Sequence, residues 1–581
     1  MNSHDANDNL TPAATCLVWT LGALALAACG STGADDTNPA SADGGSVDAT
    51  GGSVDAAGAG VDSASASEGG AAFDAGPEPD GSRSPIEAGL TGDAGRADSA
   101  ATPDAAAPHD AGSEDTSAPA AGPSPPAPNT ADVWLTTTDL QNLLAKQTAI
   151  PLSAAQPGGS TPTLDVDVTQ TFQTIDGFGA AMTDSAAYVL TNDLSDAQRQ
   201  DLMAKLFDPV AGIGLSYLRL PMGASDYTSV GSYTYDDVGS GTDPTLASFS
   251  IDHDKAYIIP RLKDALAINP ALKIMATPWS PPAWMKSNGS LNGGSLNTDA
   301  YGPYAQYFVK FIQAYQAAGL SIDTVTLQNE PQNASGTIPS MSFAANEEAD
   351  FVATALGPAF AQAGITTKIV VYDHNWQDQF TAQPTTYPQT VYSNAQATPY
   401  IAGSAFHGYS GDSSAQNAVH DANPDKAIYF TEYLAGDGED VAYTFQDIMV
   451  DKVIGAARNW AQTSILWNVV LDQNDGPQNN GCTDCRGVVT VNNSGGAATY
   501  NPEFYLLGHV SKFVFGGARR VASNTIDGMV TDVAFVNPNG TRAIVVMNVG
   551  GGAAMFRVRT AAHEFSYSLP VGATATFVWQ D

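Results

Sequence analysis

The stretch TVTLQNEP at residues 324–331 decides the fold class, because it shows a short buried strand that ends in polar residues. Its first four residues are β-branched or apolar, as in a strand covered on both faces. Glu330 follows where the strand ends, and Pro331 prevents the strand from continuing. The stretch AIYFTE at 427–432 has the same pattern and ends in Glu432. Two buried strands that end in carboxylates favour a parallel α/β fold with a site at the carboxyl ends of its strands.

Outward from these stretches, short apolar runs alternate with segments of helical period, such as 304–318 and 347–363. Eight strand–helix units over about 300 residues predict a (β/α)8 TIM barrel at 173–500. A doubly wound sheet is the alternative. It usually has fewer strands and a glycine-rich phosphate turn, and no G-x-G-x-x-G follows the first run. The predicted strands are 174–179, 216–222, 273–278, 324–328, 368–372, 401–407, 427–431 and 464–470.

The pattern changes after Asn501. Turn signals at 516–517, 537–540 and 550–552 separate strand-like runs, and no helical period is visible. We therefore predict a small antiparallel β-domain at 501–581. Residues 131–172 also contain strand-like pieces and are expected to complete the same sheet. The predicted architecture is a barrel with an antiparallel β-sandwich side domain built from both ends of the ordered region.

The first 29 residues are typical of an export signal. Their apolar run, 17–28, is too short to span a bilayer, and LAAC at 26–29 resembles a bacterial lipobox that would lipidate Cys29. Cleavage without a lipid is the alternative. Residues 30–130 hold 17 acidic and two basic residues with one aromatic, which predicts a disordered linker. We expect an exported protein that is lipid-anchored to a bacterial membrane, at the outer membrane or cell surface, or secreted. We expect no other membrane contact.

The net charge of −38 over 581 residues limits the partners. Nucleic-acid phosphates bind Lys and Arg, so this composition excludes a nucleic-acid partner and favours an uncharged substrate. Cys482 and Cys485 form C-T-D-C, and export makes a local disulfide the favoured interpretation. A zinc site would need two further spaced ligands, and a redox motif would need a βαβ context that this Asn/Gly-rich loop lacks.

Glu330 and Glu432 are the candidate catalytic pair, because strands four and seven can direct both side chains to one ligand. Glycoside hydrolysis needs two such carboxylates, and a separation of ~5–5.5 Å would make it retaining. We expect an ionised Glu432 to raise the pKa of Glu330 and so keep it a proton donor. The alternative is two surface glutamates at loop starts. Asp373 and His374 have no third spaced ligand, so we predict no metal and no cofactor.

Several other strand ends carry residues that suit a sugar, whose C–H face stacks on indole while its hydroxyls bind polar groups. These residues are Arg219, Asp226, Trp279, Asn329, His407 and Trp467.

The chain resembles glycoside hydrolase family 30, the family of lysosomal glucosylceramidase and its bacterial relatives, over roughly residues 133–579. Each motif is weak alone, but all occur in the order of the family. They are DGFGAAMTD (176–184), RLPM (219–222), SD (225–226), PWSPPAWMK (278–286), QNEP (328–331), FTE (430–432), WN (467–468), FYLLGH (504–509) and SKF (511–513).

The resemblance implies a retaining two-step mechanism with Glu432 as nucleophile and Glu330 as acid/base, without a metal. It implies that Asp226, Trp279, Asn329 and Trp467 form a glucose pocket supported by His407 and Arg219. The expected substrate is a carbohydrate or a glycolipid, as in a β-1,6-glucanase or a glucosylceramidase. A β-xylosidase, a β-fucosidase and a non-catalytic carbohydrate-binding surface lipoprotein remain alternatives.

Overall fold

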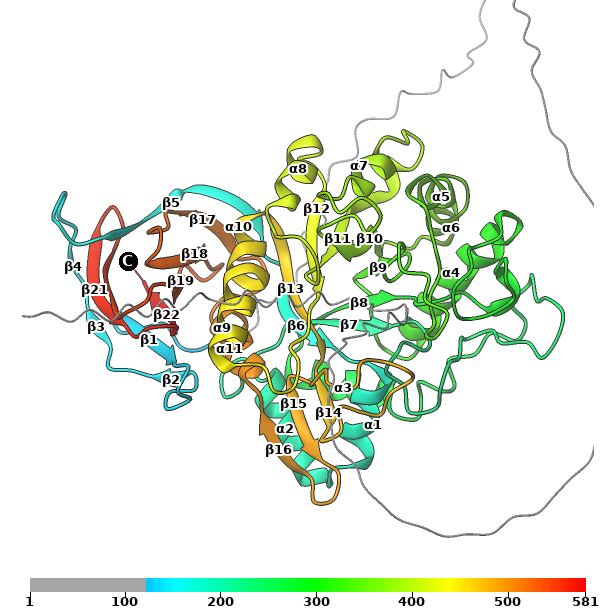
Figure 1. Ribbon diagram of the computed structural model, residues 1–581, viewed down its shortest axis with the longest axis horizontal. Helices are drawn as coiled ribbons and strands as arrows, with labels where there is room; N and C mark the ends of the chain where they lie inside the picture. The colour runs from blue at the N-terminus through cyan, green and yellow to red at the C-terminus, as the bar shows by residue number, and fades with distance from the viewer. Residues whose placement is uncertain (1–121, 581) are drawn as a thin grey trace, which may run out of the picture. The chain divides into compact units, whose positions relative to one another are not determined.

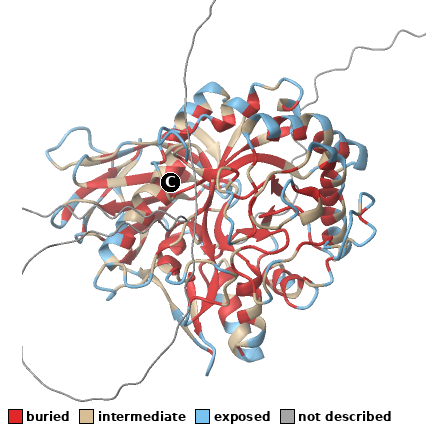
Figure 2. Cartoon of the chain, turned by 45° about the vertical axis from the view of Figure 1, so that its right-hand side comes forward, coloured by how far each residue is buried: buried red, intermediate tan, exposed pale blue. Residues whose placement is uncertain are grey.

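A computed structural model describes residues 122–580 (Figure 1). At its centre, eight parallel strands pair in chain order and close into a barrel, as predicted. The strands are buried along most of their length (Figure 2), which explains their near-continuous apolar composition. They are β6 (Gly177–Ala181), β7 (Tyr217–Pro221), β8 (Lys273–Thr277), β9 (Thr324–Thr326), β10 (Lys368–Asn375), β11 (Ile401–His407), β12 (Ala427–Glu432) and β13 (Ala461–Asn468).

Helices surround the barrel, and two of them contain π-helical segments. Val352–Leu356 joins α5 to α6, and Ile448–Gly455 joins α9 to α10. The helices are α1 (Asp184–Asn192), α2 (Asp196–Phe207), α3 (Ile258–Ile268), α4 (Tyr301–Ala317), α5 (Ala345–Phe351), α6 (Gly357–Ala363), α7 (Tyr387–Tyr392), α8 (Ala415–Ala422), α9 (Val441–Asp447), α10 (Ala456–Arg458) and α11 (Pro502–Ser511). Among the described residues, no helix is long and apolar enough to cross a bilayer.

Side chains fill the barrel, so it is a packed core and not a pore. Tyr217, Met275, Val370, Tyr429 and Ile465 belong to one buried cluster inside it. A ligand therefore has to bind at the ends of the strands and not inside the barrel. The carboxyl ends carry the polar residues described below.

The side domain is a β-sandwich built from both ends of the described chain, which confirms the prediction. Its long strand β5 belongs to both sheets, because its start pairs with β20 and the rest with β17. The β5–β20 pair is parallel, although we predicted an antiparallel domain. The strands are β1 (Thr130–Thr136), β2 (Ala145–Lys146), β3 (Ile150–Pro151), β4 (Ser153–Ala154), β5 (Thr163–Thr174), β17 (Arg519–Ser523), β18 (Val530–Val536), β19 (Arg542–Asn548), β20 (Ala554–Arg559), β21 (His563–Leu569) and β22 (Thr574–Trp579).

Helix α11 contradicts our prediction that no helix follows Asn501. It lies between the barrel and the sandwich (Figure 1), and eight of its ten residues are buried. Its His509 joins two sandwich strands, with Nδ1 2.8 Å from the Thr576 hydroxyl and Nε2 2.8 Å from that of Thr136. A helix covered on nearly all sides has no polar face, so the period that reveals a surface helix is missing.

A small sheet not predicted from the sequence follows the last barrel strand. It consists of β14 (Val470–Asp472), β15 (Val489–Asn492) and β16 (Ala497–Tyr500). The loop between β14 and β15 contains Cys482 and Cys485, which form a disulfide. This loop therefore leaves the carboxyl end of barrel strand eight, on the face where the site lies.

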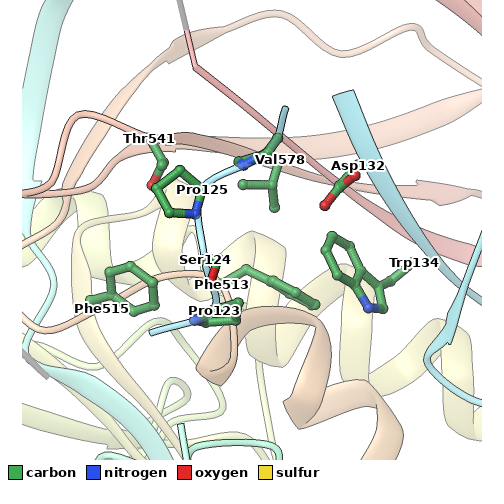
Figure 3. A pocket seen from close by; sticks show the side chains of 10 residues that line it. Pro123, Ser124, Pro125, Asp132, Trp134, Phe513, Phe515, Thr541 and Val578 are labelled. Atoms are coloured by element: carbon green, nitrogen blue, oxygen red, sulfur yellow. The ribbon is translucent and has the colours of Figure 1, made fainter. Parts of the chain in front are cut away.

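The first described residues differ from our assignment of 30–130 to a disordered linker. Pro123 and Pro125 lie against the sandwich, where they line a small crevice with Trp134, Phe513 and Phe515 (Figure 3). Proline and aromatic rings bury apolar surface here, which explains why these residues join the folded part. The predicted signal, Cys29 and the rest of the linker lie outside the described residues.

Candidate active site

The barrel brings the predicted catalytic pair together at the carboxyl ends of its strands. Glu432 is the last residue of β12, and Glu330 follows β9. Carboxylate oxygens of the two residues and a ring nitrogen of His407 all lie within 4.8 Å of one another. Retaining glycosidases hold their carboxyl groups ~5–5.5 Å apart, and inverting enzymes ~6.5–9.5 Å apart. The arrangement therefore fits the retaining geometry.

Arg219 is the centre of the network around Glu432. It is fully buried, and its Nη1 donates to Glu432 Oε2. Its Nη2 donates to Asn329 Oδ1 at 2.7 Å and to Asp373 Oδ2 at 2.8 Å. Tyr409 donates to the other oxygen of Glu432 at 2.9 Å. Both oxygens of Glu432 thus have donors, which fixes the carboxylate in one orientation.

His407 lies between the two glutamates and Asp373. Its Nδ1 is 3.2 Å from Glu330 Oε1 and 3.7 Å from Glu432 Oε1, and its Nε2 is 3.2 Å from Asp373 Oδ1. Burial lowers its pKa, but the three carboxylates outweigh burial and raise the pKa of His407 to about 9. At neutral pH the imidazolium therefore donates from both ring nitrogens.

The pKa order of the two glutamates is the reverse of our prediction. Burial raises the pKa of Glu330, but His374, His407 and the Asn333 amide lower it by more, to about 2. Burial also raises the pKa of Glu432, and here His407 and Arg219 only partly offset it. Burial lowers the pKa of His374 to about 4, so the charge beside Glu330 at neutral pH is that of His407. The prediction failed because it considered the two carboxylates without the imidazolium between them.

Unusual backbone conformations place three site residues. Glu330, Tyr372 and Asp373 have φ angles of 48°, 74° and 70°, the left-handed region that side chains with a Cβ rarely adopt. The bulge at Tyr372 and Asp373 is supported by the buried Glu348, whose carboxyl accepts from the Tyr372 amide at 3.3 Å. Strain of this kind persists only where the surroundings enforce it, and it is common at active sites.

The bulge turns Asp373 into the barrel, where its carboxylate accepts from Arg219 and from Thr431 at 2.6 Å. Burial raises the pKa of Asp373, but the Arg219 charge and these hydrogen bonds outweigh burial and hold that pKa well below its usual range. Our sequence interpretation assigned no role to Asp373 or Tyr409. The signal available was position alone, since Asp373 lies near the carboxyl end of one apolar strand and Tyr409 follows another.

The remaining predicted residues form one wall of the site. Trp279 and Trp467 stack with ring centroids 5.1 Å apart, and the Arg219 guanidinium lies 4.9 Å from the centroid of Trp279. Asp226 has a buried Oδ1 that makes no hydrogen bond among the described residues. Burial and the charge of Glu432 raise the pKa of Asp226 to about 8. A sugar hydroxyl at Asp226 would supply the hydrogen-bond partner that Oδ1 lacks.

The disulfide loop covers Asp226 from the side of strand eight. The Asn479 amide donates to the Asp226 carbonyl at 2.7 Å, and the Tyr227 hydroxyl donates to the Cys482 carbonyl at 2.8 Å. Gly481 lies so close that a Cβ there would be 2.8 Å from the Asp226 carbonyl oxygen. Close approach of this loop therefore requires glycine at 481.

Glu330, His407 and Glu432 also have the donor types of a metal site. Arg219 and Tyr409 already donate to the two oxygens of Glu432, and the charge of Arg219 would repel a cation there. The donor set therefore does not fit a metal. The sulfurs of Cys482 and Cys485 are bonded to each other.

A TIM barrel with two carboxylates this close at the ends of strands four and seven has the site of a retaining glycosidase. Comparison with known proteins specifies the class further. Residues 175–514 match the glycosyl hydrolase family 30 TIM-barrel domain, and residues 517–577 match the family 30 beta sandwich domain. The chain belongs to glycoside hydrolase family 30 and is an O-glycosyl hydrolase, as the sequence motifs predicted.

Three relatives illustrate the similarity. An endo-1,6-beta-D-glucanase of Aspergillus fumigatus is 36% identical over 74% of this chain and 91% of its own. The lysosomal acid glucosylceramidase of Mus musculus is 30% identical over 65% of this chain and 75% of its own. An endo-beta1,6-glucanase of solved structure is 35% identical, covers 78% of this chain and 100% of its own, and superposes with a TM-score of 0.71.

Proposed function

We propose that the protein hydrolyses β-1,6-linked glucan with retention of anomeric configuration. The observation that carries the reaction type is the close pair Glu330 and Glu432 with a fixed cation on Glu432. The similarity to endo-1,6-β-glucanases, in sequence and in structure, supports the linkage.

In the proposed mechanism, Glu432 attacks the anomeric carbon while the bond from that carbon to the leaving oxygen breaks. Glu330 gives a proton to that oxygen. Water then attacks the glycosyl-enzyme and gives a proton to Glu330, and the bond between the sugar and Glu432 breaks. Asn329, fixed by Arg219, is in position to bind the sugar 2-hydroxyl, a contact that strengthens in the transition state.

Glu330 is ionised in the free enzyme, so it must receive a proton before it can protonate the leaving oxygen. His407 is protonated and its Nδ1 lies 3.2 Å from Glu330 Oε1. The Glu330 side chain is 15% exposed, and a bound substrate would displace the water that reaches it. Loss of this hydration raises the pKa of a carboxyl group. We therefore propose that substrate binding transfers the His407 proton to Glu330.

The test is a product profile on linear β-1,6-glucan, β-1,3-glucan, glucosylceramide and aryl β-glucoside, β-xyloside and β-fucoside. NMR of the first product gives the stereochemistry. We expect β-1,6-glucan to be the best polymer and the first product to be the β-anomer. Faster cleavage of glucosylceramide, xyloside or fucoside than of any glucan would refute the linkage. Binding of glucan without any cleavage would refute the activity and leave a carbohydrate-binding protein.

We also propose export and lipid anchoring through Cys29, which the LAAC motif supports. Expression of wild type and Cys29→Ser in a Gram-negative host, followed by detergent phase partition, tests this proposal. We expect wild type in the detergent phase and Cys29→Ser in the aqueous phase. Equal partition of the two would refute the anchor.

A further inference from the structure

Residues 376–385 form a hairpin that stands on the carboxyl face of the barrel directly after β10. Its base is closed by the bridge between Gln377 and Pro384 and by the Thr385 amide, which donates to the Trp376 carbonyl at 2.9 Å. Residues 379–384 at its tip are all exposed. Phe380 is 75% exposed, the highest fraction among the exposed large hydrophobic residues of the described chain.

The Asp378 carboxylate organises the tip through hydrogen bonds to the residues that follow it. Asp378 Oδ1 accepts from the Phe380 amide at 3.1 Å, the Thr381 amide at 2.9 Å and the Thr381 hydroxyl at 2.9 Å. The Ala382 amide donates to the Asp378 carbonyl at 3.0 Å. Phe380 is therefore presented to solvent by a pre-ordered turn and not by a loose loop.

Two loops of the active site hold this hairpin. On one side Gln332, two residues after Glu330, donates to Asp378 Oδ2 at 2.5 Å. On the other side the Gln377 amide donates to the Ser410 carbonyl at 3.1 Å, and Ser410 adjoins Tyr409, the donor to Glu432. Phe380 thus stands on the rim, between the loop of Glu330 and the loop of Tyr409.

The part of the rim that carries the hairpin is where the leaving group, the part of the substrate beyond the cleaved bond, would lie. The wall for the sugar that is attacked consists of Asp226 and Trp279, which follow strands two and three of the barrel, and Trp467, which lies in strand eight. The hairpin follows strand five, across the barrel from that wall. The leaving oxygen must also face Glu330, whose loop contacts the hairpin. The part of the substrate beyond the cleaved bond therefore extends toward residues 376–385.

We propose that Phe380 is a stacking platform for a sugar ring of the leaving part of a glucan chain. The inference rests on the proposed function, because it assumes a saccharide on both sides of the cleaved bond. The exposed neighbours Gln379, Thr381 and Gln383 favour this occupant. An isolated phenyl ring among amide and hydroxyl groups matches a sugar, which has a C–H face edged with hydroxyls. A lipid chain would need a continuous apolar surface.

The experiment compares Phe380→Ala, Phe380→Tyr and Met555→Ala with wild type on linear β-1,6-gluco-oligosaccharides and on an aryl β-glucoside. Met555 is 54% exposed on β20 of the sandwich, so its variant controls for loss of an exposed apolar side chain. We expect Phe380→Ala to raise KM for the oligosaccharides about three- to tenfold. We expect unchanged kinetics on the aryl glucoside, wild-type behaviour of Phe380→Tyr, and no effect of Met555→Ala.

Equal oligosaccharide KM values for Phe380→Ala and Met555→Ala would overturn the platform while the glucanase activity of wild type stands. An effect on glucosylceramide in micelles without an effect on oligosaccharides would overturn it in favour of a lipid contact. The wild-type panel decides the proposed function separately. If wild type prefers another glycan, the KM values of Phe380→Ala and wild type are compared on oligosaccharides of that glycan. If wild type cleaves no saccharide chain, both proposals fail.

Discussion

Replacement of His407 by Gln removes the imidazolium between the two glutamates. It should therefore move the acidic limb of the pH–activity profile to higher pH. A positive charge favours the ionised form of a neighbouring carboxyl group, so its loss raises the carboxyl pKa. His407 Nδ1 lies 3.7 Å from Glu432 Oε1. Unit charges about 4 Å apart interact by about 4 kcal/mol at an effective dielectric constant of about 20. This energy corresponds to about 3 pKa units. In the His407→Gln enzyme, Arg219 still contacts Glu432, and water can enter beside the smaller Gln side chain. We therefore expect the pKa of Glu432 to rise by about one to two units.

The assay is kcat/KM against pH with a dinitrophenyl β-glucoside. Its leaving group needs no proton, so the acidic limb reports ionisation of the proposed nucleophile in the free enzyme. Because a raised pKa keeps Glu432 protonated to higher pH, the His407→Gln enzyme should lose activity at a higher pH than wild type. His420→Gln is the matched control, because His420, in α8, stacks on Trp460 and contacts neither glutamate. An acidic limb of His407→Gln that coincides with that of His420→Gln would refute the reasoning.

Three further predictions concern the other parts of the site. Glu432→Gln should lower kcat/KM for an aryl β-glucoside by about 10⁴-fold or more, with an unchanged melting temperature by circular dichroism. Asp226→Ala should lower kcat/KM about 10- to 100-fold in steady-state assays, because it removes the side chain that would hydrogen-bond a sugar hydroxyl. Replacement of both Cys482 and Cys485 by Ser should lower the free energy of unfolding in urea by about 2 kcal/mol or less, since the disulfide closes a very short loop.

The sequence was sufficient for the barrel because each strand is a short apolar run with a polar residue behind it. The run before Glu330 and the run before Glu432 form β9 and β12, and strand order followed from chain order. Helix α11 was missed for the opposite reason. It is buried on nearly all sides, so its sequence has no polar period to distinguish it from strands.

The contacts among site residues were much less predictable than the strands. Asp373 reaches Arg219 and Thr431 only because a bulge gives Tyr372 and Asp373 positive φ angles. The support for that bulge comes from Glu348, in a helix that precedes the strand. Neither residue type nor spacing reveals such a tertiary arrangement, which explains why no role for Asp373 was predicted from the sequence.

The two cations of the site differ in a way that matches the two proposed roles. Arg219 stays charged at any physiological pH, and it binds Glu432, the proposed nucleophile, which must remain ionised. His407 can release a proton, and it lies beside Glu330, the proposed acid/base, which must gain and return one in each cycle. An exchange of the two cations would leave the total charge unchanged but would give the nucleophile a partner that can lose its charge. His407 lies close to both glutamates, but only Glu432 also contacts Arg219, so the division of labour between the two carboxylates depends on that permanent charge.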